Sequence, residues 1–160
     1  MKNNKLTNIK DVINACKKNP LIKCHVGASD EDLRHAMTVL KVKFPQSFVK
    51  YVRECGWLDI AGEVVLGLGP RIPKSKSSFR VSQRECLDGV PPLRPKLIVV
   101  YEVGNGDLEC MDCNKVKDGE CPVVLWEHDH PEPELQKPRI LNRTFTRWLA
   151  DKVFSAPEIT

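Results

Sequence analysis

The segment between residues 97 and 129 constrains the fold most strongly, because apolar runs of strand length alternate there with turn sequences. The runs cover residues 97–103, 108–111 and 122–128, and the turns are Gly104-Asn105-Gly106-Asp107 and Asp118-Gly119. Asn-Gly and Asp-Gly readily adopt the positive φ angles that tight hairpins require. The segment therefore predicts an antiparallel meander of three strands.

The first and last strands of this meander are apolar on both of their alternating faces. In the first strand, Leu97 and Val99 occupy one face, whereas Ile98 and Val100 occupy the other. A strand with two apolar faces belongs to a sheet that is covered on both sides. We therefore expect helices from the N-terminal part and from the C-terminal end of the chain to cover this sheet.

Helical spacing and helix-ending residues define these covering helices. Behind the capping residue Asn8, one helical face carries Ile9, Val12, Ile13 and Cys16. Comparable patterns predict helices over residues 8–18, 45–55, 80–87 and 142–154 and a further helix that starts at residue 29. A strand is predicted over residues 63–68, and loops are predicted over residues 70–78 and 129–138. The sequence thus predicts a single α+β domain over residues 1–160, in which a largely antiparallel meander packs against N-terminal helices and a C-terminal helix.

The bulk properties of the 160 residues fit an ordinary globular protein of the cytoplasm. The chain has no apolar run of about 18 residues, which a membrane span needs. Its polar first residues lead into no apolar signal segment. The seven cysteines are an odd number in a chain without an export signal, so we expect reduced thiols.

Charge is divided unevenly along the chain. Residues 1–98 contain 18 Lys and Arg against 9 Asp and Glu, whereas residues 99–160 contain 7 against 12. The acidic residues concentrate between positions 101 and 135, and they are Glu102, Asp107, Glu109, Asp112, Asp118, Glu120, Glu127, Asp129, Glu132 and Glu134. They are interpreted either as a solvated sheet edge with its loops or as a docking surface for a basic protein.

A zinc site is one alternative interpretation of the same region. Cys110-x-x-Cys113, Cys121 and His128 could supply three thiolates and an imidazole in tetrahedral geometry. Residues three apart in a strand point to opposite faces, however, so Cys110 and Cys113 converge only if the chain turns between them. The favoured interpretation is buried or edge thiols, with no metal and no cofactor.

The other catalytic and nucleic-acid patterns are weaker. Cys55 stands at a helix C-terminus, where the dipole disfavours a thiolate, which argues against a Cys–His nucleophile although partners could still meet in space. The sequence Gly104–Asp107 leads into a strand, whereas a phosphate loop must lead into a helix. The lysines of the basic half are spread over several helices with few aromatic residues, so direct nucleic-acid binding is not favoured.

Five pieces of sequence, in their order along the chain, resemble one known family. They are Phe44-Pro45-x-x-Phe48-x-x-Tyr51-Val52 with Gly56; Glu63-Val64-Val65-Leu66-Gly67; Val100-Tyr101-x-x-Gly104-Asn105-Gly106-Asp107; Gly119-Glu120-Cys121-Pro122-Val123-Val124-Leu125-Trp126; and Phe145-x-x-Trp148-Leu149. Together they resemble the SUKH superfamily of Smi/Knr-like proteins over about residues 28–152, with residues 1–27 as a helical extension. Within the superfamily, the chain is most similar to YobK-type antitoxins.

This resemblance implies an α+β fold and a non-catalytic role. Bacterial members typically act as immunity proteins that bind and neutralise a cognate polymorphic toxin, often a nuclease. We therefore expect this chain to bind such a toxin and to occlude its active site. The eight contact candidates are the acidic residues from Glu102 to Asp129 given above, and the chain itself is expected to be a monomer or a weak homodimer. A regulatory scaffold, as in eukaryotic relatives, and a zinc-binding or Cys-dependent enzyme remain the alternatives.

Overall fold

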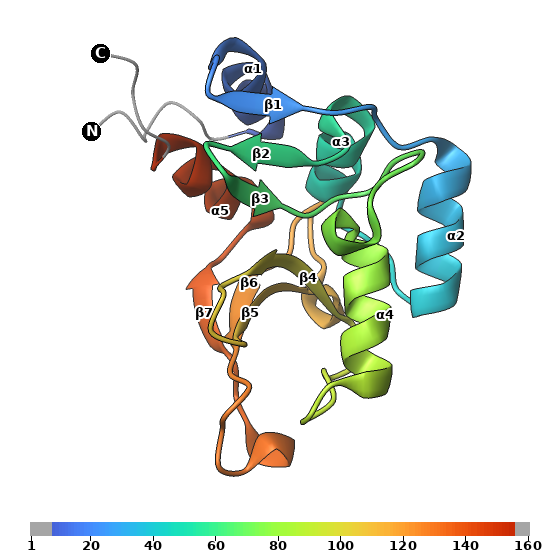
Figure 1. Cartoon of the computed structure of the whole chain (residues 1–160), viewed down its shortest axis with the longest axis vertical. Coiled ribbons are helices and arrows are strands. Elements are labelled where there is room, and N and C mark those ends of the chain that lie inside the picture. The colour runs from blue at the N-terminus through green and yellow to red at the C-terminus, as the bar shows by residue number, and fades with distance from the viewer. Residues whose placement is uncertain (1–7, 156–160) are drawn as a thin grey trace.

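The computed structural model describes residues 8–155, which form an α+β fold with two antiparallel sheets (Figure 1). Its helices are α1 (Ile9–Lys18), α2 (Asp30–Leu40), α3 (Gln46–Cys55), α4 (Ser78–Asp88) and α5 (Phe145–Phe154). Its strands are β1 (Ile22–Cys24), β2 (Leu58–Ile60), β3 (Glu63–Val65), β4 (Leu97–Glu102), β5 (Leu108–Asp112), β6 (Val123–Trp126) and β7 (Arg139–Asn142). Short 3-10 helices occupy Lys74–Lys76 (η2), Cys113–Lys115 (η3) and Pro133–Leu135 (η4).

The predicted meander is confirmed as the four-stranded sheet, whose order is β4-β5-β6-β7. The register pairs Leu108 with Trp126 across β5 and β6. Both predicted turns use positive φ angles: Gly104 and Gly106 have φ near 101°, and Asp118 has φ 54°. Glycine and Asp tolerate these angles better than other residues do, which is why these sequences end the strands.

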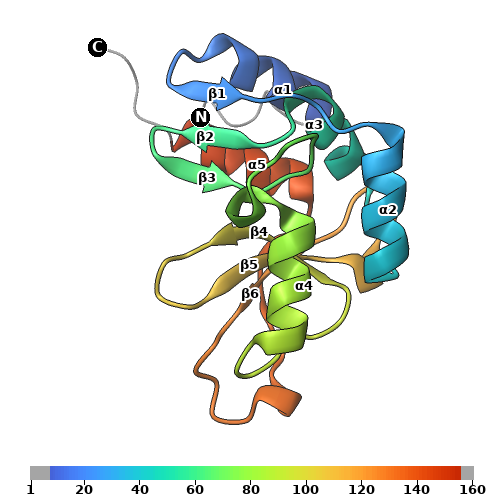
Figure 2. The same cartoon turned by 45° about the vertical axis from the view of Figure 1, so that its right-hand side comes forward.

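The expected cover on both faces of this sheet is also confirmed. Val99, Cys110 and Val124 point toward α4 and form one buried cluster with Val81. Figure 2 shows α4 crossing in front of the sheet. Residues of the opposite face, including Ile98, Val100, Met111 and Val123, join the main core with α3 and α5. The alternating apolar positions of β4 thus separate two cores.

The helices follow their capping residues closely. Asn8 accepts the backbone N–H of Asp11 at 2.9 Å, and Ser29 forms a reciprocal capping box with Asp32. Helix α4 starts at Ser78, two residues before the predicted start. Helix α5 starts at Phe145, three residues after the predicted start, because Thr144 is its N-cap.

The three-stranded sheet β1-β2-β3 lies above the four-stranded sheet in the view of Figure 1. The sequence did not predict β1, β2 or β7, and the strand expected over residues 63–68 pairs only as Glu63–Val65. Beyond β3 the chain turns toward the second sheet, where the Leu66 N–H donates to the Val100 carbonyl at 2.9 Å. This bond links the two sheets.

Glycines allow the backbones of three chain segments to lie in direct contact next to the Leu66–Val100 hydrogen bond. A Cβ atom on Gly67 would lie 1.7 Å from the Gly56 carbonyl oxygen, and one on Gly27 would lie 1.8 Å from the Arg53 carbonyl oxygen. No side chain fits at such distances, so the β1–α2 linker, the end of α3 and the segment after β3 require glycine here. Tyr51 strengthens the junction by donating its hydroxyl hydrogen toward the carbonyls of Val65 and Leu66.

Replacing Gly67 with Ala tests this junction. The added Cβ must displace a backbone carbonyl, so we expect a loss of about 3 kcal/mol in the free energy of unfolding. Gly104→Ala is the matched control, because its Cβ meets nothing within 4 Å and only the φ of 101° is unfavourable, which costs about 1–2 kcal/mol. Urea denaturation measures both; a smaller loss for Gly67→Ala than for Gly104→Ala would contradict the contact.

Candidate functional site

The acidic residues predicted as a docking surface do not form one patch. Asp107 precedes β5 and Asp112 ends it, so the two lie at opposite ends of the four-stranded sheet. The end with the β4–β5 turn carries Glu102, Asp107, Glu127 and Asp129, which we call the sheet-end cluster. The other end carries Asp112, Asp118 and Glu120 beside the start of α3, where the Ser47 N–H donates to the Gly119 carbonyl at 3.1 Å.

Glu120 is bonded within the protein. Its carboxylate accepts the Ser47 hydroxyl at 2.8 Å and the Thr146 N–H at 3.3 Å, and it also accepts the Thr146 hydroxyl. The negative charge therefore lies at the N-terminus of α5, where the helix dipole stabilises an anion. Glu120 thus joins α3, the β5–β6 turn and α5.

Glu109 has a comparable internal role at the middle of the sheet. One of its carboxylate oxygens accepts the indole N–H of Trp148 at 2.7 Å and lies 3.5 Å from the Lys152 ammonium. Lys152 in turn lies 3.7 Å from the ring centre of Tyr101. Only 14% of the Glu109 side chain is exposed. Its charge is therefore directed at α5 instead of at solvent.

In the sheet-end cluster, Glu102 and Asp129 present carboxylates to solvent, whereas Asp107 and Glu127 are half-buried. Asp129 is exposed, and Glu102 has 42% of its side chain exposed with Arg84 3.9 Å away. Asp107 is the ordered member: it accepts the backbone N–H of His128 at 3.1 Å and lies 2.7 Å from the His128 ring nitrogen Nδ1. These bonds hold the β4–β5 turn against the end of β6.

Partial burial acts to raise the pKa of Asp107, but the hydrogen bonds from His128 outweigh it and lower that pKa. The same hydrogen bond to Asp107 raises the pKa of His128. Sequence reasoning did not identify this pair. The sequence nevertheless contained a signal for it. A meander that pairs Leu108 with Trp126 also places Asp107 and His128, which lie just outside these two residues, close to each other.

Among residues 8–155, one group has donor atoms spaced as metal ligands are: Asp107, His128 and Asp129, whose ligand atoms lie within 4.8 Å of one another. The alternative zinc set is divided instead. Cys110 lies in the cluster under α4, whereas Cys113 and Cys121 lie in the main core on the other face. Cys110 and Cys113 thus point to opposite faces of the sheet, as expected for two residues of an extended chain that are three positions apart.

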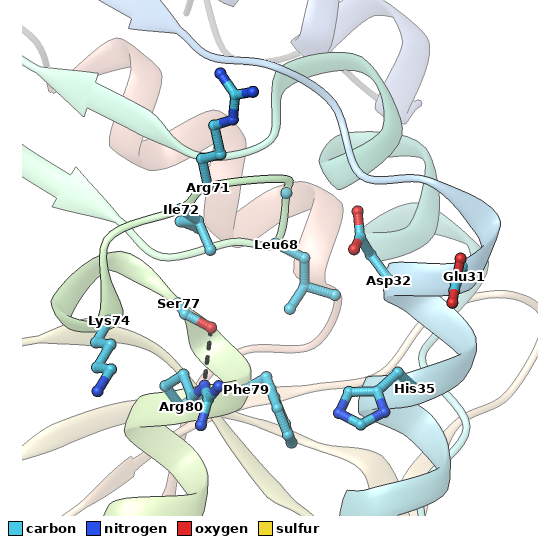
Figure 3. Close-up of a pocket in the computed structure, with 11 residues that line it drawn as sticks. Glu31, Asp32, His35, Leu68, Arg71, Ile72, Lys74, Ser77, Phe79 and Arg80 are labelled. Atoms are coloured by element: carbon cyan, nitrogen blue, oxygen red, sulfur yellow. Dashed lines mark hydrogen bonds between the residues drawn. The ribbon is translucent and has the colours of Figure 1, made fainter.

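A pocket of about 430 Å³ lies between α2 and the segment that leads into α4 (Figure 3). Its α2 wall carries Glu31, Asp32 and His35, and cations such as Lys74 and Arg80 lie on the opposite wall. His35 packs against the edge of Phe79 with ring centres 5.4 Å apart. The Ser77 hydroxyl in the wall caps α4 by accepting the Arg80 N–H. These contacts place no nucleophile beside a base.

Glu120→Gln should lower the free energy of unfolding by about 2 kcal/mol. The amide NH2 cannot accept the hydroxyls that the carboxylate accepts, and hydrogen bonds to a charged group are worth more than neutral ones. Asp118→Asn, at an exposed turn position nearby, should change it by less than about 0.5 kcal/mol. Urea midpoints at unchanged m-value compare the two; equal stabilities would refute the internal role of Glu120.

The pKa of the His128 ring should lie above the ordinary value of 6.5, and Asp107→Asn should lower it, although the charge of Asp129 remains nearby. The ion pair exists between the lowered pKa of Asp107 and the raised pKa of His128. His128 therefore makes its full contribution to the free energy of unfolding at pH values below the ordinary pKa of histidine. This contribution is lost as the pH rises through the raised pKa of His128 in the folded protein. NMR titration of the imidazole measures the shift; an unchanged pKa in Asp107→Asn would contradict the pairing.

One family model matches nearly the whole described part of the chain. The model of the SUKH_5 family, described as SMI1-KNR4 cell-wall, matches residues 9–154. This range contains every helix and strand from α1 to α5. It is wider than the range of the sequence resemblance, so it also includes α1 and β1.

No helix among residues 8–155 is both long enough and apolar enough to span a bilayer.

Proposed function

The chain belongs to the SUKH family, whose members are often immunity proteins, and from this premise we propose that it neutralises a cognate polymorphic toxin in the cytoplasm. It would act by binding, and it would block the active site or substrate channel of the toxin. The toxin would be a nuclease with a basic surface. The sheet-end cluster would be the contact, and its exposed carboxylates are the observation that supports this proposal most directly.

Charge complementarity favours this partner. A nuclease must attract the phosphate backbone, so its active-site groove is positively charged. Carboxylates at Glu102, Glu127 and Asp129 match such a groove and would accelerate association. Phosphate mimicry over the whole molecule is not part of the proposal, because the net charge of the chain is +4.

The cluster also has a fixed geometry. Asp107 is held by two contacts with His128, and the Glu127 N–H donates to the Gln136 side chain at 2.8 Å. Gln136 is buried and donates back to the Glu127 carbonyl at 3.1 Å. Carboxylates on a backbone that is ordered before binding lose less conformational entropy when the complex forms.

The proposal uses only part of the predicted acidic surface. Glu109 and Glu120 bond to α5, and Asp112 accepts the Asn114 N–H at 3.1 Å. Reversing these charges would disturb the fold, so lost protection would not report on the interface. Asp118 is exposed but lies at the far end of the sheet, and it therefore serves as a control.

Co-expression with a polymorphic toxin domain as the candidate partner tests the function. We expect the wild-type chain to restore growth and to form a complex with the toxin in size-exclusion chromatography. Glu102→Lys, Glu127→Lys and Asp129→Lys together should slow association about tenfold or more at low salt and weaken protection. Glu31→Lys, Asp88→Lys and Asp118→Lys, which change exposed positions outside the cluster by the same net charge, should protect as the wild type does.

Each contrary result has a separate meaning. A wild-type chain that neither binds nor protects would refute the immunity function. Binding without protection would favour the regulatory scaffold instead. Full protection by the cluster variant, with the association rate unchanged, would show that the toxin contacts a different surface.

A further inference from the structure

Two cysteines of the N-terminal half lie side by side, although 31 positions separate them in the sequence. Cys24 ends β1 and Cys55 ends α3, and their Sγ atoms are 3.4 Å apart. The backbones are joined next to the thiols, because the His25 N–H donates to the Cys55 carbonyl at 2.8 Å. The proximity of the sulfur atoms thus follows from how β1 docks on α3.

The two thiols differ in access to solvent. Cys55 is fully buried, whereas Cys24 is half-buried on β1, an outer strand of the three-stranded sheet. Lys17 lies close by in the last turn of α1 and pairs with Glu54 at 2.6 Å. A small oxidant can therefore reach Cys24 first, in a neighbourhood that contains a cation.

We propose that Cys24 and Cys55 form a peroxide-oxidisable dithiol, in which Cys24 is the reactive thiol and Cys55 the resolving thiol. The pair is a modification site, and its product is a disulfide between the edge strand β1 and the C-terminus of α3. This inference is independent of the proposed toxin binding.

The electrostatics of the pair support this division of roles. The hydrogen bond with Cys55 lowers the pKa of Cys24 to about 7, and Lys17 contributes in the same direction. That hydrogen bond, together with burial, raises the pKa of Cys55. Either thiol can donate while both are neutral, but only Cys55 can donate once Cys24 is a thiolate. Near neutral pH, Cys24 is therefore ionised to a larger extent than an ordinary cysteine, and the thiolate is the reactive form.

The reaction has two steps and needs only a peroxide as oxidant. The Cys24 thiolate attacks one oxygen of hydrogen peroxide, the O–O bond breaks, and the departing hydroxide takes up a proton to become water. The resulting sulfenic acid is then attacked by the Cys55 sulfur. The S–S bond forms while the sulfenic hydroxyl leaves with the Cys55 proton as a second water. Two thiols lose two electrons in total, and the peroxide is reduced to two waters.

Other cysteines provide an internal comparison. Cys86 is half-buried as Cys24 is, but burial and the neighbouring Glu85 raise its pKa. Cys110 and Cys121 are buried, and in both the pKa is raised, by burial in Cys110 and chiefly by its contact with Cys113 in Cys121. Cys16 lies beneath the reactive pair and is fully buried, which raises its pKa to about 12. Oxidation should therefore begin at Cys24.

Hydrogen peroxide treatment of the reduced full-length chain tests the site. Intact mass should fall by about 2 Da, and peptide mapping should find Cys24 linked to Cys55, with reversal by dithiothreitol. The rate of alkylation of Cys24 should rise with a midpoint near pH 7, following its lowered pKa. Cys55→Ser should leave a sulfenic acid at Cys24 that a dimedone probe captures.

Two further variants distinguish the pair from general thiol oxidation. Cys24→Ser should slow the first oxidation about tenfold or more. Five of the remaining thiols have raised pKa values, and Cys113 is buried. Cys16→Ser, the matched control at a buried neighbour, should leave the Cys24–Cys55 disulfide intact. Linkage of other cysteines first, or an unchanged oxidation rate in Cys24→Ser, would overturn the proposal.

Discussion

The docking of α5 on the four-stranded sheet is the contact on which the rest of the structure depends. Phe145 packs edge-on against Phe48 of α3 with ring centres 5.4 Å apart, so α5 closes the core between α3 and the sheet. Two carboxylates fix its position: Glu120 bonds to its N-terminus and Glu109 to its middle. Burial of aromatic side chains stabilises this contact, and the charged hydrogen bonds fix the orientation of the helix.

This docking gives the acidic half of the chain two different roles. The inward carboxylates of Glu109 and Glu120 accept hydrogen bonds from α5 and belong to the fold. Within residues 8–155, the carboxylates at the β4–β5 end contact no donor on α5. Asp107 bonds to His128 and Asn105, and Glu102 lies 3.9 Å from Arg84. The charge asymmetry of the sequence therefore reports partly on internal packing and partly on an exposed surface, and only the exposed part can steer a basic partner.

Sequence predicted the features that local interactions determine. Asn8 caps α1 by accepting the N–H of Asp11, only three positions away, and Asp118-Gly119 forms a tight turn between neighbouring segments. Strands β1, β2 and β7 were missed because three or four residues show no periodicity, and distant segments decide their pairing. The inward carboxylates were equally hidden, since Glu109 and Glu120 find their partners 39 and 26 positions away.

Hydrogen exchange of the free chain and of its complex with the cognate toxin domain distinguishes the sheet-end cluster from every other surface that could bind the toxin. Binding through the sheet-end cluster predicts that added protection is confined to residues 102–107 and 127–130, while α5 and the turn at 117–120 exchange at the same rates in both states. Protection centred on the helices α1 to α3, with the sheet end unchanged, would contradict it.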